Sequence, residues 1–198
     1  HYVPSTADRE LWIAGVPFFD SISFPFLLVS SYGLAWWLLS RPPWGSVRGE
    51  RGIRSRPGRA RHLMLATALF VLADVIIDPV ALRGERWFLG RIYGYPEPGV
   101  YFGVPVANFL GWGTVGVAAT ALYHAWERRQ PVLPAAAFRG RALLCPGLYF
   151  VVLAFNLTVT FALREWWLGL CGALLALPVA VMTLRACTFW RAFGGTPR

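Results

Sequence analysis

Long apolar runs separated by short polar connections dominate the pattern of the chain. A helix that crosses a membrane needs about 20 mostly apolar residues. Five runs qualify, at residues 21–40, 62–82, 105–126, 142–163 and 166–185. The pattern predicts an all-α fold, a polytopic membrane helix bundle of about five transmembrane helices, with residues 1–198 forming a single transmembrane domain.

Residues 83–104 differ from the five apolar runs. Most of this stretch reads "RWFLGRIYGYPEPGVYFGV", in which glycine and proline interrupt an aromatic-rich sequence. Glycine and proline disfavour a continuous helix, whereas aromatic side chains suit the membrane interface. We interpret residues 83–104 as an interfacial or re-entrant segment that packs over one end of the bundle.

Composition and charge strengthen the membrane assignment. Of the 198 residues, 56 % are hydrophobic and 15 % are charged, whereas about a quarter of a typical soluble domain is charged. The net charge of +9 comes from 19 arginines without any lysine. Because these arginines lie in the connections, the positive-inside rule explains them, and we expect no nucleic-acid partner.

The distribution of arginine also predicts an orientation. Fourteen arginines fall in the first connection, the third connection and the C-terminal tail, and five fall on the opposite side. The rule places the arginine-rich side in the cytoplasm. We therefore expect a multi-pass protein of the bacterial cytoplasmic (inner) membrane, with its N-terminus outside and its C-terminus in the cytoplasm.

Two aspartates interrupt the second apolar run. Asp74 and Asp78 are spaced i, i+4, so they share one helix face with Cβ atoms about 5–6 Å apart. Two carboxylates so close in a low dielectric repel each other, and one is expected to stay protonated near neutral pH. Pro79 is expected to weaken the helix at Asp78. A neutral acid beside an anionic one suits proton donation to a weak base.

A structural alternative remains open for the two acids, namely pairing with arginines of the following stretch such as Arg83 or Arg86. Nearby, Asn108 follows Pro105 by about one helical turn, where its amide could hold a water molecule or a carboxylate. Asp20 lies at the mouth of the first helix, as an N-cap or as part of a site.

The remaining polar and aromatic side chains have simpler interpretations. An aromatic belt alone would explain Trp87, Tyr93, Tyr95 and Tyr101. His62 and His124 are interpreted as structural, with ligation of a chlorophyll or haem as the alternative. The three cysteines lack metal-ligand spacing, so no disulfide and no metal site is predicted.

The order of residues from 74 to 112 resembles a known family. The chain carries "D-x-x-x-D-P-V-A", then a tryptophan, then "G-x-Y-F-G-V-P-x-x-N-F-x-G-W". This combination resembles the membrane-integral carotenoid biosynthesis family that includes γ-carotene end-group hydratases and bisanhydrobacterioruberin hydratases. An earlier "GVPFFD" is similar to the opening of another family helix, so the resemblance covers roughly residues 15–125. The matching positions are Asp74, Asp78, Pro79, Trp87, Gly99, Tyr101, Phe102, Gly103, Pro105, Asn108, Phe109, Gly111 and Trp112.

The resemblance implies hydration of the terminal C-1,2 double bond of an acyclic carotenoid end group, by acid–base catalysis and without a cofactor. It implies that Asp74 and Asp78 supply the acid and its partner, and that Asn108 orients water. Residues assigned to substrate binding on the same basis are Trp87, Tyr101, Phe102, Phe109, Trp112 and Asp20. The expected partners are a carotenoid substrate and membrane lipid.

The chain departs from the family pattern before "GVPFFD". Members generally have additional helices there, and the printed sequence has none. This departure keeps a second interpretation open, in which the protein is a non-catalytic carotenoid-binding structural subunit of a larger membrane complex, photosynthetic or otherwise pigment-binding. In that interpretation the carotenoid is a bound pigment, and other membrane subunits are partners.

Overall fold

The computed structural model describes residues 11–13, 16–39, 58–87, 90–91, 93–130 and 143–192. Five helices within these residues are long and apolar enough to cross a membrane. The five-helix prediction is therefore confirmed. The helices are α1 (Phe18–Leu39), α2 (Arg59–Ala81), α3 (Val106–Glu127), α4 (Leu144–Ala162) and α5 (Trp166–Ala192).

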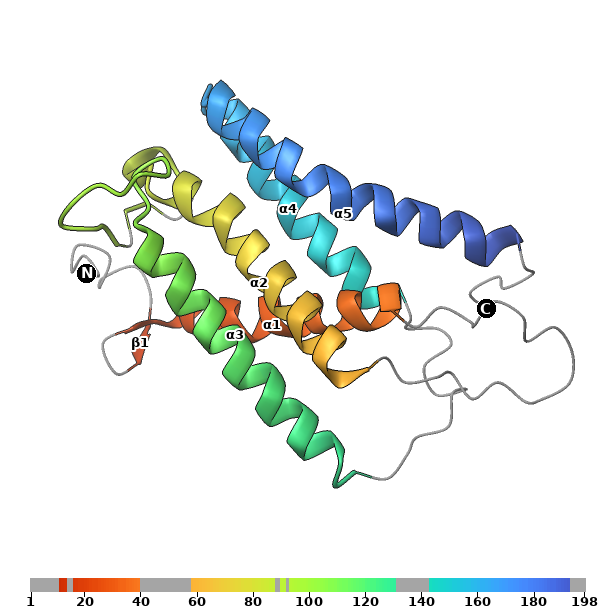
Figure 1. Ribbon diagram of the computed structural model, residues 1–198. Helices are drawn as coiled ribbons and strands as arrows, with labels where there is room; N and C mark the ends of the chain where they lie inside the picture. The colour runs from red at the N-terminus through yellow and green to blue at the C-terminus, as the bar shows by residue number, and fades with distance from the viewer. Residues whose placement is uncertain are drawn as a thin grey trace, which may run out of the picture.

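Helix α2 is the centre of the bundle, because it packs against each of the other four helices. Figure 1 shows α3 on one side of α2 and the α4–α5 pair on the other, with α1 passing behind. Helix α4 also packs against α1, which closes the bundle on that side. The C-terminal end of α2 is buried in this arrangement, from Asp78 to Ala81.

Small residues let these helices approach closely. A Cβ atom added at Gly116 of α3 would lie 3.1 Å from the Phe70 ring and 3.2 Å from the Thr67 side chain of α2. A Cβ atom added at Gly33 of α1 would lie 2.4 Å from Cβ of Cys145 in α4. Between lipid-embedded helices, where lipid tails are as apolar as leucine, such close packing supplies much of the association energy.

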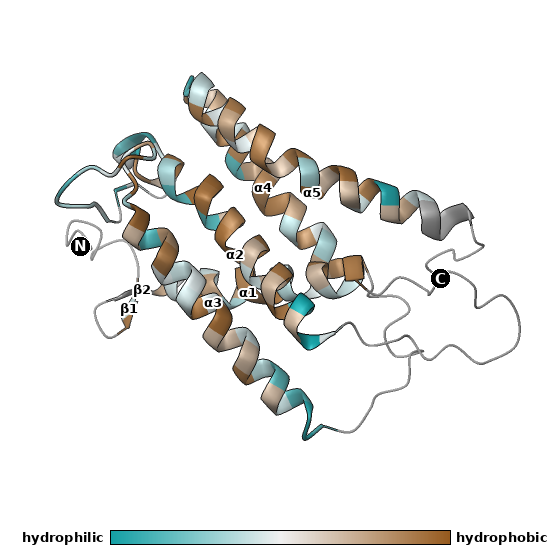
Figure 2. Cartoon of the chain, viewed as in Figure 1, coloured by the Kyte–Doolittle hydropathy of each residue, from teal (hydrophilic) through white to brown (hydrophobic). Residues whose placement is uncertain are grey.

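The surface of the bundle is apolar along the helices and polar near their ends (Figure 2). Helix α5, for example, exposes Leu170, Leu174 and Leu177 by 48 %, 67 % and 54 %. A soluble protein would not leave so continuous an apolar face in contact with water. The arrangement suits hydrocarbon around the middle of the bundle.

Several details differ from the sequence-based expectations. Helix α5 runs seven residues further than expected, to Ala192, and two short antiparallel strands, β1 (Trp12–Ile13) and β2 (Val16–Pro17), precede α1. Helix α1 begins at Phe18, so Asp20 lies inside its first turn and the N-cap interpretation is wrong. The side chain of Asp20 and most of the arginine-rich connection at 41–61 lie outside the described residues.

The expectation that Pro79 weakens the helix at Asp78 is also wrong. Helix α2 continues through Pro79 to Ala81, and the N–H of Leu82 donates to the carbonyl of Asp78 at 3.1 Å. Proline lacks an N–H, so it removes only the hydrogen bond to the carbonyl four residues earlier, at Val75. One lost bond near the end of a packed helix does not open it.

Candidate active site

The candidate site lies where α2 ends, and we call this region the aspartate end, defined by Asp74, Asp78 and Asn108. The two aspartates occupy the last two turns of α2 and are only 2 % and 4 % exposed. Burying a carboxyl group is costly unless polar partners surround it. The structure supplies such partners from two further elements.

Asn108 is the first of these partners. It lies in the first turn of α3. Its side-chain Nδ2 donates to Asp74 Oδ2 at 2.8 Å and to Asp78 Oδ2 at 3.1 Å. One amide group therefore bridges both carboxyl groups, which confirms that the i, i+4 spacing turns the two acids to one face of α2.

Two tyrosines supply the next contacts. The hydroxyl of Tyr93 donates to Asp78 Oδ1, and the hydroxyl of Tyr95 donates to Asp78 Oδ2 at 2.8 Å. Both oxygens of Asp78 are thus hydrogen-bonded by phenols from outside the helices. Sequence reasoning assigned these tyrosines to an aromatic belt and missed this role. The "YGY" spacing was the available clue, because residues i and i+2 of an extended chain project to the same side.

The segment at 83–104 reaches the aspartates through a series of turns. A 3₁₀ helix, η2 (Gly84–Arg86), begins it, and isolated bridges join Gly99 to Gly103 and Tyr101 to Val104 near its end. A Cβ atom at Gly99 would lie 2.1 Å from the backbone of Val104 and of Pro105, so only glycine fits there. The described part of this segment contains no helix long enough to cross a membrane, as its glycine and proline content predicted.

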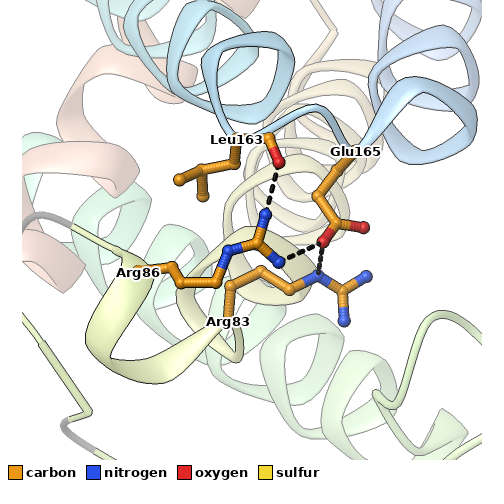
Figure 3. Close-up of polar contacts among 4 residues, drawn as sticks. All are labelled: Arg83, Arg86, Leu163 and Glu165. Carbon is orange, nitrogen blue, oxygen red and sulfur yellow. Dashed lines mark hydrogen bonds and ion pairs between the residues drawn. The ribbon is translucent and has the colours of Figure 1, made fainter.

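Arginines fasten the start of the segment to the α4–α5 turn, as Figure 3 shows. Arg86 Nη1 lies 3.0 Å and Arg83 Nε lies 3.4 Å from Oε1 of Glu165. Arg86 also donates to the carbonyl of Leu163. The structural alternative in the sequence analysis paired these two arginines with the aspartates. In the structure, both arginines form ion pairs with Glu165 instead.

An aromatic layer lies one turn deeper than the carboxyl groups. Trp112 follows Asn108 by four residues on α3, and Phe70 precedes Asp74 by four residues on α2. The Trp112 ring stacks on Phe24 of α1 at 4.2 Å between centroids and contacts the Phe70 ring at 4.6 Å. These three rings form the floor of the aspartate end. Phe24 and Phe70 were not expected there, because their place depends on how α1 and α2 are rotated.

The other aromatic residues assigned to the site form two groups. The Tyr101 ring contacts the rings of Phe102 and Phe109 at 5.1 Å and 5.8 Å. The Tyr101 hydroxyl is buried and finds no hydrogen-bond partner among the described residues. Burial, followed by the nearby Cys171 thiol, raises the pKa of the Tyr101 phenol above its usual value. Trp87 packs instead in an apolar cluster with Val80 and Leu168.

A comparison with known proteins identifies the family of the chain. Residues 7–183, well over half of the chain, match the family of carotenoid biosynthesis proteins. The chain belongs to this family. No curated protein and no solved structure matches it.

The donors around the two carboxyl groups of this carotenoid biosynthesis protein include the Asn108 amide and the Tyr93 and Tyr95 hydroxyls, all of them uncharged groups. Among the described residues, no group of three or more His, Cys, Asp or Glu side chains could hold a metal ion. Asp74, Asp78 and Asn108 meet as a unit, the rings of Tyr101, Phe102 and Phe109 lie together, and Trp112 lies below. The arrangement offers a buried acid pair with an apolar wall, which can hold a proton beside an apolar substrate.

Proposed function

We propose that this carotenoid biosynthesis protein hydrates the terminal C-1,2 double bond of an acyclic carotenoid end group. The supporting observation is the buried pair of carboxyl groups bridged by the Asn108 amide. An isolated alkene is a very weak base, so its protonation needs a neutral acid held in a water-poor site. Two carboxyl groups in one such site favour a state in which one is neutral and the other ionised.

The proposed reaction balances without any change of oxidation state. The neutral carboxyl group gives its proton to C-2, the double bond is lost, and a tertiary cation forms at C-1. Water attacks C-1 and its proton passes to the ionised carboxylate, which leaves a tertiary alcohol. Transfer of one proton between the two aspartates then restores the starting state, so the pair needs no cofactor for this chemistry.

The aromatic side chains have a place in the same scheme. A cation near an aromatic face is stabilised by the ring quadrupole, and the Trp112, Phe24 and Phe70 layer lies directly below the carboxyl pair. Tyr101, Phe102 and Phe109 would line the entry of the polyene. Trp87 would act through packing of the segment, and Asp20 is kept as a prediction without structural support.

The proposed orientation follows from the arginine distribution. It places the aspartate end on the outer side of a bacterial cytoplasmic membrane, with the C-terminus in the cytoplasm. A cysteine introduced at residue 54, in a chain whose natural cysteines are replaced by serine, should react with an impermeant maleimide only after the cells are opened. If the cysteine at residue 54 reacts in intact cells, the protein has the opposite orientation in the membrane.

Turnover tests the hydratase proposal against the pigment-binding alternative. The purified chain, supplied with excess acyclic carotene, should form several equivalents of tertiary alcohol and should retain little carotenoid. A structural subunit would instead keep about one carotenoid per chain, gain stability from it by mass action and co-purify with other membrane subunits. Tight stoichiometric pigment without hydroxylated product would refute the hydratase.

A further inference from the structure

We propose that Tyr93 and Tyr95 fix Asp78 as the ionised member of the pair, which makes Asp74 the proton donor. This inference rests on the proposed hydratase function and assigns the two carboxyl groups to different steps. Asp74 would protonate the alkene, and Asp78 would receive the proton of the attacking water. The tyrosines would act through Asp78 and would therefore be positioning residues.

The first argument comes from the donors around Asp78. Tyr93 donates to Oδ1, and Tyr95 and the Asn108 amide both donate to Oδ2. A carboxylate has about four lone-pair sites and accepts all of these bonds, whereas a protonated carboxyl group must give one site to its own proton. Hydrogen bonds to the charged form favour that form. Ionised Asp78 is therefore the better partner for this set of donors.

The second argument comes from the coupling between the two acids. Asp74 shares the Asn108 amide with Asp78 and is 2 % exposed. Once Asp78 is ionised, a second negative charge beside it in a buried site is strongly disfavoured. Asp74 is also the deeper of the two, because it lies one helical turn after Phe70, whose ring contacts the Trp112 ring. A neutral Asp74 keeps a transferable proton on the side where the apolar substrate would rest.

The third argument is that phenols suit this task better than charged donors. A phenol, with an ordinary pKa near 10, stays neutral and donates a hydrogen bond without cancelling the carboxylate charge. Asp78 therefore remains able to accept a proton from water. Arg83, Arg86 and Glu165 pair with one another at the α4–α5 turn. The titratable side chains beside Asp78 include Tyr93 and Tyr95 from the segment at 83–104, which donate to it, and Asp74 from α2, which shares the Asn108 amide with it.

The segment is well built to hold the two phenols. Its start is fastened to Glu165 by Arg83 and Arg86, and its end is closed by the bridge between Gly99 and Gly103. Tyr93 itself packs against the apolar cluster of Val80, Ala81, Trp87 and Leu168. The position of the Tyr93 hydroxyl is therefore determined by packing on both α2 and α5.

Infrared spectroscopy tests the assignment independently of turnover. The purified wild type should show the carbonyl stretch of a neutral carboxylic acid, with the usual small shift in D₂O. Asp74→Asn should remove this band, whereas Asp78→Asn should leave it, because the burial of Asp74 still disfavours its charged form when the neighbouring charge is gone. Glu127→Gln, the same change of carboxyl to amide at the other end of α2 and α3, is the matched control and should also leave it. A band that survives in Asp74→Asn and disappears in Asp78→Asn would overturn the assignment.

Kinetics of the tyrosine variants test the positioning role. Tyr93→Phe with Tyr95→Phe should lower kcat about 10-fold or more, leave KM within about twofold, and move the acid limb of the pH–rate profile upward by about one pH unit, because ionised Asp78 loses two donors. Tyr123→Phe, which removes an exposed phenol from α3, is the control. Each single variant should give a smaller shift in the same direction.

The outcomes separate this inference from the proposed function. A wild type that turns over carotene, with an unchanged pH profile in the double tyrosine variant, would refute the positioning role alone. A wild type that never forms alcohol, but whose neutral-acid band depends on Asp74, would refute the hydratase and retain the charge assignment. A double variant with unchanged kcat and a raised KM would show that the tyrosines contact substrate instead.

Discussion

The two ends of the α2–α3 pair carry different kinds of polar cluster. The aspartate end gathers donors around two acids, whereas the opposite end, which we call the histidine end (Tyr32, His62, His124 and Glu127), contains a chain of hydrogen bonds that connects three helices. The two lie about 18 Å apart along α2, at 1.5 Å per residue from His62 to Asp74. Both have buried side chains at their centre, namely Asp74 and Asp78 at one end and His62 and His124 at the other, and both join a third element to the same two helices.

Hydrogen bonds at the histidine end fix the state of each ring. His62 Nε2 lies 3.0 Å from the Tyr32 carbonyl, which can only accept, so His62 carries its proton on Nε2. His62 Nδ1 then accepts from Nε2 of His124 at 2.8 Å. The Tyr32 hydroxyl donates to Glu127 Oε2 at 2.8 Å, and its ring packs edge-on against His62. Both nitrogens of His62 are engaged, which supports the structural interpretation over ligation of a pigment.

The difference between the ends indicates where chemistry is possible. At the histidine end, hydrogen bonds between side chains link α1, α2 and α3. At the aspartate end, two carboxyl groups share the Asn108 donor. Because two buried carboxylates repel each other, this site favours at most one ionised carboxyl group. The rings of Phe24, Phe70 and Trp112 separate the two clusters. We therefore expect substitutions at the aspartate end to change activity, and those at the histidine end to change stability.

The largest expected effect is the loss of hydration in Asp74→Asn or Asp78→Asn. Asparagine has nearly the same shape but cannot donate or accept the proton, so the rate should fall about 10²–10⁴-fold. The protein should still insert and purify in normal yield. Product analysis by chromatography measures the rate, with Glu127→Gln as the control that retains activity. If both aspartate variants hydrate carotene at the wild-type rate, the acid–base proposal is refuted.

The next effect is expected from Gly99→Ala. The new Cβ atom would lie 2.1 Å from the backbone of Val104 and Pro105, so the turn must shift and carry Tyr93 and Tyr95 away from Asp78. We expect turnover to fall about 10-fold, because small displacements of catalytic groups have large effects. Gly111→Ala is the matched control, since nothing lies within 4 Å of its added Cβ atom. Similar losses in both variants would contradict this explanation.

The sequence predicted some of these features because they depend on local spacing. The five helices follow from apolar runs, since a chain in lipid must satisfy its own backbone hydrogen bonds. The shared face of Asp74 and Asp78 follows from the helical period. The sequence also suggested that the Asn108 amide could hold a water molecule or a carboxylate, but its spacing alone did not say that it would bridge both aspartates.

Other features depend on contacts between distant segments, which spacing does not encode. Tyr93 and Tyr95 reach Asp78 through turns with positive φ at Gly90 and Gly103. The path of such turns is not readable from composition. Glu165 became the partner of Arg83 and Arg86 because the α4–α5 turn comes to lie beside η2. Contacts between distant segments therefore decide the partner of the two arginines, and the pairing with Asp74 and Asp78 that the sequence suggested is not formed by them.

A smaller effect, on stability alone, is expected at the histidine end. His62→Ala leaves His124 Nε2 without its acceptor and removes the link to α1, so the free energy of unfolding should fall by about 1–2 kcal/mol. Thermal unfolding in detergent measures this loss. Turnover per folded molecule should stay unchanged, because the aromatic layer separates His62 from the carboxyl pair. A loss of turnover without a loss of stability would show that the two ends are coupled.

The smallest effect is expected from Tyr101→Phe, which tests the boundary of the aspartate end. The Tyr101 hydroxyl is buried and has no hydrogen-bond partner among the described residues, so its removal should cost little stability near neutral pH. Burial raises the pKa of this phenol in the folded state, and the unfolded chain therefore loses the proton first as the pH rises. Wild-type stability should accordingly decline from about pH 10 upward, and Tyr101→Phe should decline less steeply over the same range. Urea unfolding in detergent at pH 8 and pH 10.5 compares the two proteins.

If substrate or water uses the Tyr101 hydroxyl, KM or kcat of Tyr101→Phe will change a few-fold while stability at neutral pH is retained, which would extend the aspartate end to Tyr101. If KM and kcat of Tyr101→Phe are unchanged, the polar residues that affect the reaction are limited to Asp74, Asp78, Asn108 and the two tyrosines that donate to Asp78.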